Sequence, residues 1–228
     1  MNGIHLALLG GALAALAACG PRYEGSSEIV TGVGQGLLAR FGLDGGSSST
    51  APAAEATAAP ALDMTALAAD GREFILASIP SRDTFALIQP AGQNGPERTW
   101  LSEDGISVTF ESGMLVATRG LGPDLMAADV SGTVAAMRQG GGAATRVHEY
   151  LDGNDQIVRF DYSCRVDVAG TEEIAIYDRT YASVKFTESC ERGSQAFTNS
   201  YWLDETGVVR KSRQLISPPV GYLDTNRL

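Results

Sequence analysis

Short apolar segments separated by polar turns recur through residues 73–215 of this chain. In the clearest example, Ile106, Val108 and Phe110 alternate with polar residues, a turn follows at Ser112-Gly113, and an apolar segment returns over 114–118. Alternation on both sides of a tight turn is typical of a β-hairpin. Segments spaced about ten residues apart, with few helical patterns between them, predict a mainly β fold: an antiparallel β-barrel or sandwich-like domain with a few short helices.

The individual strands are assigned from these segments and from the turns that separate them. A short helix is expected over 131–138, because glycines at 140–142 interrupt the pattern that follows. Glu172 and Glu173 are assigned to a solvated hairpin loop after Gly170. The expected strands cover residues 73–79, 84–89, 99–101, 106–110, 114–118, 145–151, 156–168, 173–179, 181–190, 195–203 and 208–215.

The chain begins with an apolar leader. Residues 4–18 contain no Asp, Glu, Lys or Arg, and their apolar run is shorter than the about 20 residues that a membrane-spanning helix needs. The leader ends in the sequence LAAC (residues 16–19), which is similar to a lipobox, although residues 1–5 lack the usual Lys or Arg. We therefore predict a lipoprotein signal peptide over 1–18 and a Cys19 that carries a diacylglycerol and a further acyl chain such as palmitate.

Two segments of different composition separate Cys19 from the β pattern. Residues 28–41 carry an apolar stripe at helical spacing, although three glycines within it weaken a helix. Residues 42–62 are rich in Gly, Ser, Ala and Pro, which is typical of a flexible linker. The predicted organisation is a signal peptide over 1–18, a lipidated N-terminus with a short helix and a linker over 19–62, and a β-rich periplasmic domain over 63–228.

Charge and length restrict the partners of this chain. Lys and Arg number 17 against 27 Asp and Glu, and the formal net charge of −10 argues against nucleic acid as a partner. Anionic lipid headgroups would also repel such a chain, so association with a membrane should come from the lipid anchor. Removing 18 residues from 228 leaves 210, which suits one domain and a tether.

Two further cysteines, Cys164 and Cys190, lie in the predicted β domain. Export would bring them into an oxidising compartment, where a disulfide between them is favoured over two buried free thiols. Closing this loop should stabilise the fold by about 3–4 kcal/mol in the chain-entropy description.

Few residues suggest catalysis. His148 is the one histidine outside the leader, and we interpret it as a surface residue of a strand. No Gly-x-Ser-x-Gly motif accompanies it, and a zinc site would need more His or Cys ligands. The acidic residues available for a glycosidase-type pair are Asp161, Glu172, Glu173 and Asp178. We assign no catalytic residue, no metal site and no cofactor.

Aromatic residues near basic ones are the candidates for glycan contact. Trp100, Tyr201 and Trp202 could stack on sugar rings, or could instead pack in the core. Tyr201 and Trp202 are neighbours on a strand, so they should face opposite sides of it. Arg210 and Lys211 follow closely and could meet an anionic polysaccharide.

Two regions of the sequence resemble the YjbF/GfcB family of lipoproteins from exopolysaccharide and group 4 capsule operons. The first comprises residues 100–105 (WLSEDG) and 113–125 (GMLVATRGLGPDL), and the second comprises residues 199–204 (NSYWLD) and 207–218 (GVVRKSRQLISP). The resemblance implies a barrel-like β domain in the periplasm, on the inner face of the outer membrane. It also implies a part in producing or exporting extracellular polysaccharide, with other export proteins as partners. It supplies no catalytic residue.

Three functional hypotheses remain open from the sequence. The leading one is a non-enzymatic lipoprotein for assembly or export of surface polysaccharide. The others are a glycan-acting enzyme that uses a carboxylate pair, and a scaffold for other envelope proteins.

Overall fold

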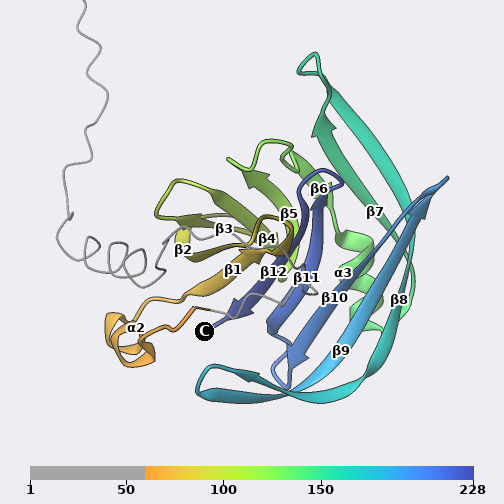
Figure 1. The fold of residues 1–228 in the computed structure, drawn as a ribbon. Helices are drawn as coiled ribbons and strands as arrows, with labels where there is room; N and C mark the ends of the chain where they lie inside the picture. The colour runs from red at the N-terminus through yellow and green to blue at the C-terminus, as the bar shows by residue number, and fades with distance from the viewer. Residues whose placement is uncertain (1–59) are drawn as a thin grey trace, which may run out of the picture. The chain divides into compact units, whose positions relative to one another are not determined.

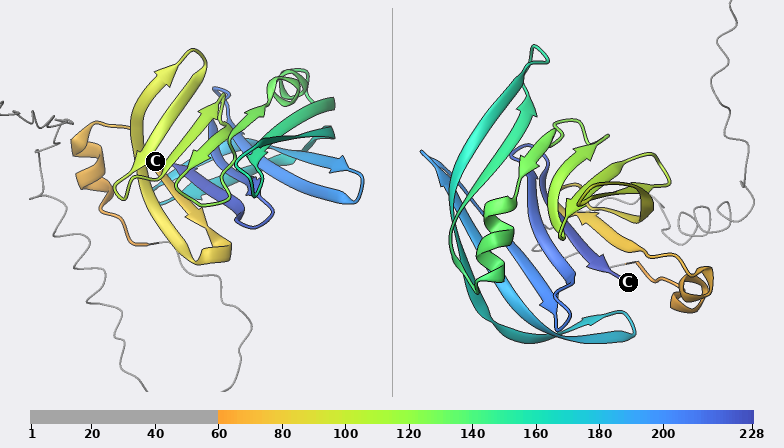
Figure 2. Two further views of the ribbon diagram at one scale, coloured as in Figure 1. Left: turned by 90° about the horizontal axis from the view of Figure 1, so that it is seen from above. Right: turned by 180° about the vertical axis from the view of Figure 1, so that it is seen from behind.

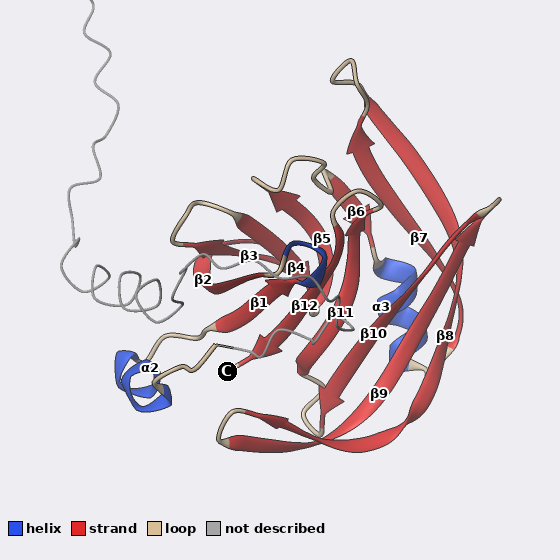
Figure 3. Cartoon of the chain, in the orientation of Figure 1, coloured by secondary structure: helices blue, strands red, loops and turns tan. Residues whose placement is uncertain are grey.

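The computed structural model describes residues 60–228, whose strands form one twelve-stranded antiparallel sheet (Figure 1). The sheet curves until its two edge strands lie beside each other, which gives a nearly closed barrel (Figure 2). The strands are β1 (Ile75–Ile79), β2 (Thr84–Asn94), β3 (Glu97–Ser102), β4 (Ser107–Glu111), β5 (Met114–Arg119), β6 (Ala127–Asp129), β7 (Gly142–Leu151), β8 (Ile157–Ile176), β9 (Arg179–Arg192), β10 (Gln195–Asp204), β11 (Val209–Ser217) and β12 (Gly221–Arg227). Helices α2 (Met64–Asp70) and α3 (Ser131–Arg138), with a short 3-10 helix at Pro80–Arg82, complete the described residues (Figure 3).

The strand order follows the chain almost everywhere. It runs β5-β4-β3-β2-β1-β12-β11-β10-β9-β8-β7-β6, so every hydrogen-bonded pair except β1–β12 joins consecutive strands. Hairpins therefore account for nearly all of the sheet, as the turn-rich sequence predicts. The pairing of β1 with β12 joins the two ends of the domain and leaves the seam of the barrel between β5 and β6.

Side chains close part of this seam. Leu115 lies on edge strand β5 and is fully buried, so both of its backbone groups need partners. Its N–H donates to Gln214 Oε1 of β11 at 2.7 Å, and its carbonyl accepts from Arg146 Nη2 of β7 at 2.9 Å. Two long polar side chains thus replace a neighbouring strand at this point.

Helix α3 covers the adjoining edge of β7 on the inner side of the barrel. Val134 and Met137 pack against Phe186 and Tyr201 of the sheet. The backbone of the helix approaches β7 so closely at Gly132 that a Cβ there would lie 2.7 Å from the carbonyl oxygen of Thr145.

We expect Gly132→Ala to destabilise the fold by about 1–3 kcal/mol, since the added methyl meets backbone rather than a movable side chain. Urea unfolding of the purified protein would measure the change. Gly153→Ala is the matched control, because nothing lies within 4 Å of a Cβ at that exposed turn. Equal stability of the two variants would contradict the close packing of α3 on β7.

A bulge in the longest strand changes which side chains face inward. The register of β8 against β9 shifts between Val168 and Gly170, where Gly170 has a φ of 134°. Beyond this bulge, Ile174 and Ile176 cluster with Trp202, whose strand neighbour Tyr201 is packed in the inner core. The end of the β8–β9 hairpin therefore has a small apolar cluster of its own on the outer face.

The mainly β fold and helix 131–138 are confirmed, and the hairpin turn Ser112-Gly113 has positive φ at both residues (50° and 83°). The predicted loop after Gly170 is wrong, because the strand continues through Glu172 and Glu173 to Ile176. The prediction failed because a β-strand can continue past a bulge at glycine, and β8 stays paired with β9 beyond Gly170. Helix α2, which the sequence analysis did not predict, is capped by the Asp63 carboxylate.

The predicted signal peptide, the predicted lipid-attachment residue Cys19, the helix expected over 28–41 and most of the linker lie outside the described residues. Within residues 60–228, no helix has both the length and the apolar composition needed to cross a membrane.

Candidate functional site: a buried ion pair and an arginine-lined cavity

The interior of the barrel contains a fully buried ion pair. Arg146 on β7 and Glu188 on β9 both have 0% exposed side chains, and Arg146 Nη1 lies 3.1 Å from Glu188 Oε2. Alternation along β7 directs Arg146 inward together with His148, because residues two apart share one face of a strand.

Glu188 accepts hydrogen bonds from several elements besides β7. Asn199 Nδ2 donates at 2.8 Å and Tyr201 Oη at 2.7 Å, and Thr133 of α3 donates through its hydroxyl. Burial raises the pKa of the Glu188 carboxyl, but the Arg146 charge and these hydrogen bonds outweigh it and leave the pKa below its usual value. The carboxylate is therefore ionised and fastens α3 to the sheet.

His148 is buried, so its assignment as a surface residue is wrong. Its Nε2 accepts a hydrogen bond from Arg146 Nε at 2.8 Å, and a guanidinium can only donate. The ring proton must then be on Nδ1, which lies 2.9 Å from Tyr150 Oη, while Tyr150 donates to the Ile216 carbonyl at 3.0 Å. Burial and the Arg146 charge hold the pKa of His148 well below its usual value. The histidine is a neutral link in this chain of hydrogen bonds.

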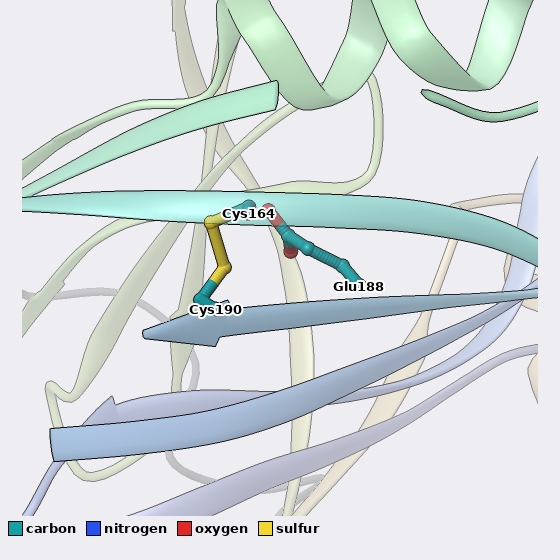
Figure 4. Close-up of side chains that lie close together, drawn as sticks. All are labelled: Cys164, Glu188 and Cys190. Atoms are coloured by element: carbon teal, nitrogen blue, oxygen red, sulfur yellow. A yellow bond between two sulfur atoms is a disulfide. The ribbon is translucent and has the colours of Figure 1, made fainter. Parts of the chain in front are cut away.

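The disulfide between Cys164 and Cys190 is present and joins directly opposite residues of β8 and β9 (Figure 4). Glu188 lies beside it, and these three residues are the one grouping among the described residues with metal-ligand spacing. Both sulfurs are used in the disulfide, and the carboxylate is taken by Arg146 and its other donors. These three residues therefore stabilise the structure and are not free to bind a metal ion.

A cavity of about 670 Å³ opens at the end of the barrel formed by the β2–β3, β4–β5 and β10–β11 hairpins and the end of α3. Its apolar lining includes Trp100, Phe110 and Met114. Arg98, Arg138 and Arg227 also line it, and no acidic side chain does so within the described residues.

Two of these arginines cover Trp100. The guanidinium carbons of Arg98 and Arg227 lie 4.8 and 5.7 Å from the centre of its ring, within the range of a cation–π interaction. Both arginines also pair with Glu73, Arg227 at 2.8 Å. Arg138, in the last turn of α3, makes no ion pair with any residue in the range 60–228.

The candidate glycan-contact residues do not form one surface. Trp100 lies under the arginines of the cavity, and Tyr201 is fully buried beside Glu188. Trp202 lies on the outer face, where Lys211 is 5.0 Å from its ring. Arg210 pairs with Asp204 in the β10–β11 hairpin. Only Trp100 among them reaches the cavity.

The candidate carboxylates are also dispersed. Asp161 pairs with Arg159 on an exposed stretch of β8, 3.0 Å apart. Glu172 accepts from the indole of Trp202 on the outer face, Glu173 is exposed on β8, and Asp178 lies in the β8–β9 turn.

Sequence reasoning missed the residues that the structure groups most tightly. Arg146 and Glu188 are far apart in the sequence and look like ordinary strand polar residues, and no sequence motif links the three cavity arginines, of which Arg138 lies on a helix. The available signal was the spacing of Arg146, His148 and Tyr150 at every second position, which places three polar groups on one strand face.

The loop between β5 and β6 contains the end of the motif at residues 113–125, and its contacts explain two of the polar residues there. Arg119 donates to the carbonyls of Leu125 and Met126, both at 3.0 Å. Asp124 accepts from Thr118 Oγ1 at 2.7 Å and from the N–H of Gly120 at 2.9 Å. These contacts hold the segment that connects the two seam strands.

Comparison with known proteins identifies a family over most of the chain. The model of the family described as "Group 4 capsule polysaccharide lipoprotein gfcB, YjbF" matches residues 49–228. A crystal structure of the hypothetical lipoprotein YmcC from Escherichia coli K12 has a similar fold, with a TM-score of 0.61 and 21% sequence identity over 69% of this chain and 83% of that one. No curated protein sequence matches the chain.

Proposed function

Because this chain belongs to the YjbF family of group 4 capsule polysaccharide lipoproteins, we propose that it is an outer-membrane lipoprotein, facing the periplasm, that takes part in the production, assembly or export of an extracellular polysaccharide. The observation that carries this proposal is the family match over residues 49–228, which spans the whole β domain. The lipid on Cys19 would hold the domain at the membrane, since a chain of net charge −10 gains nothing from anionic headgroups.

We further propose that the protein acts by binding rather than by catalysis. The cavity presents guanidinium groups beside apolar side chains, which recognise ligands through charge and apolar contact. The buried groups that could transfer protons, Glu188 and His148, are engaged with Arg146 and with the hydroxyls of Tyr201 and Tyr150.

Deletion of the gene should lower the amount or the chain length of extracellular polysaccharide, and the wild-type gene should restore it. Cys19→Ala should neither incorporate labelled palmitate nor restore the polysaccharide, because the acylated thiol is absent. Ala18→Gly is the matched control, since it keeps a small residue before the cleavage point and should still be acylated. Unchanged polysaccharide after deletion would refute the proposed function, and palmitate on the Cys19→Ala variant would refute the anchor.

A further inference from the structure

We propose that the arginine-lined cavity is a binding site for an acidic segment of glycan, and that its arginines take the carboxylate or phosphate group of a sugar residue. This inference rests on the proposed function, since it names the chemical class of the polysaccharide that the protein handles.

The first argument is the charge of the cavity. The chain as a whole has a net charge of −10, yet three arginines and no acidic residue of the described part line this cavity. Glu73 pairs with Arg98 and Arg227, so this one carboxylate neutralises only part of the charge of the three guanidinium groups. The local excess of positive charge favours an anionic ligand.

The second argument is that Arg138 has no ion-pair partner among residues 60–228. It occupies the last turn of α3 and lines the cavity. A guanidinium has five N–H donors in a planar fork that matches a carboxylate or a phosphate with two parallel hydrogen bonds. Arg138 is thus the group most available to a ligand.

The third argument is the remaining lining. Trp100, Phe110 and Met114 give the cavity an apolar wall, and its volume of about 670 Å³ lies within the range of roughly 300–1,000 Å³ that is usual for small-molecule sites. A sugar ring has apolar C–H faces as well as polar edges, so a lining that combines apolar side chains with guanidinium groups suits an acidic sugar better than a free inorganic anion.

Trp100 makes this binding directly measurable. The chain has two tryptophans, and the second, Trp202, lies on the outer face. In a Trp202→Phe protein, Trp100 is the sole tryptophan, and its fluorescence should change when a ligand moves the arginines that cover it. Titration with tetragalacturonic acid tests the carboxylate and titration with mannose 6-phosphate tests the phosphate. The methyl ester of the first and free mannose are the neutral counterparts.

We expect at least one acidic ligand to bind about 10-fold or more tightly than its neutral counterpart, with an affinity that falls as salt is added. Arg138→Gln should weaken that binding by about 10-fold or more, because a charge-assisted hydrogen bond is lost. Arg159→Gln, which removes an exposed arginine of β8, should leave it unchanged. Thermal unfolding of both variants would establish that they are folded.

Equal binding of acidic and neutral ligands, or equal affinities of the folded Arg138→Gln and Arg159→Gln variants, would overturn the inference. The proposed function would survive that result if gene deletion still reduced extracellular polysaccharide. Conversely, suppose that acidic ligands bind at Arg138 but that gene deletion leaves extracellular polysaccharide unchanged. That result would refute the proposed function and would support the arginine-lined cavity as a binding site for acidic ligands.

Discussion

Glu188→Ala should lower the free energy of unfolding by about 3–5 kcal/mol, the largest effect of any single substitution considered for this protein. The substitution leaves the Arg146 guanidinium charged in a site where its side chain has no exposed surface. It also removes the acceptor of the Asn199 amide and the Tyr201 hydroxyl. Breaking a buried pair from one side is costly because the remaining charge has neither water nor a counter-ion.

Urea unfolding of the purified protein, with Arg146→Met, Glu188→Ala and the double variant, would measure this effect. The double variant should lose less stability than the sum of the two single variants, since the pair is then removed as a unit. Arg159→Ala breaks an exposed pair with Asp161 and should have no measurable effect. Additive losses, or a loss from Glu188→Ala no larger than that from Arg159→Ala, would show that the ion pair does not fasten the interior.

The same carboxylate should contribute to acid sensitivity. The pKa of Glu188 is lowered on folding, whereas in the unfolded chain it returns to about 4.3. Its contribution to stability is therefore present above that pH and is lost as the pH falls through the folded-state value. Between pH 7 and about pH 3, Glu188→Gln should lose less stability than the wild-type protein, because its amide does not titrate.

The second large effect should come from the disulfide. The variant Cys164→Ala/Cys190→Ala should lose about 3–4 kcal/mol, because the closed loop with a sequence separation of 26 residues no longer restricts the unfolded chain. The two sulfurs also pack with Phe197 and Leu215 in the interior, so their loss removes apolar contact as well.

Denaturation with and without a reducing agent would isolate the covalent contribution. Reduction should destabilise the wild-type protein by a similar amount and should leave the double alanine variant unchanged. A wild-type protein whose unfolding midpoint is insensitive to full reduction would contradict the stabilising role of the bond.

The class of fold and its local connections follow from the amino-acid sequence alone. Alternating residues such as Val108 and Phe110 define strands, and the Ser112-Gly113 pair supports the positive φ values that a tight hairpin turn requires. These are short-range effects of backbone sterics and of the two-residue period of a strand, so they can be read from neighbouring residues. The disulfide was also predictable, because two cysteines in a chain expected to be exported have few alternatives.

The roles of the polar residues depend on the tertiary structure. Arg146 and Glu188 lie 42 positions apart in the sequence, and each resembles an exposed strand residue until the sheet closes and turns both inward. His148 was misassigned for the same reason, since period-two alternation tells which residues share a face but not which face becomes the interior. The three arginines of the cavity come from β3, α3 and β12, and it is barrel closure, a long-range event, that brings them together.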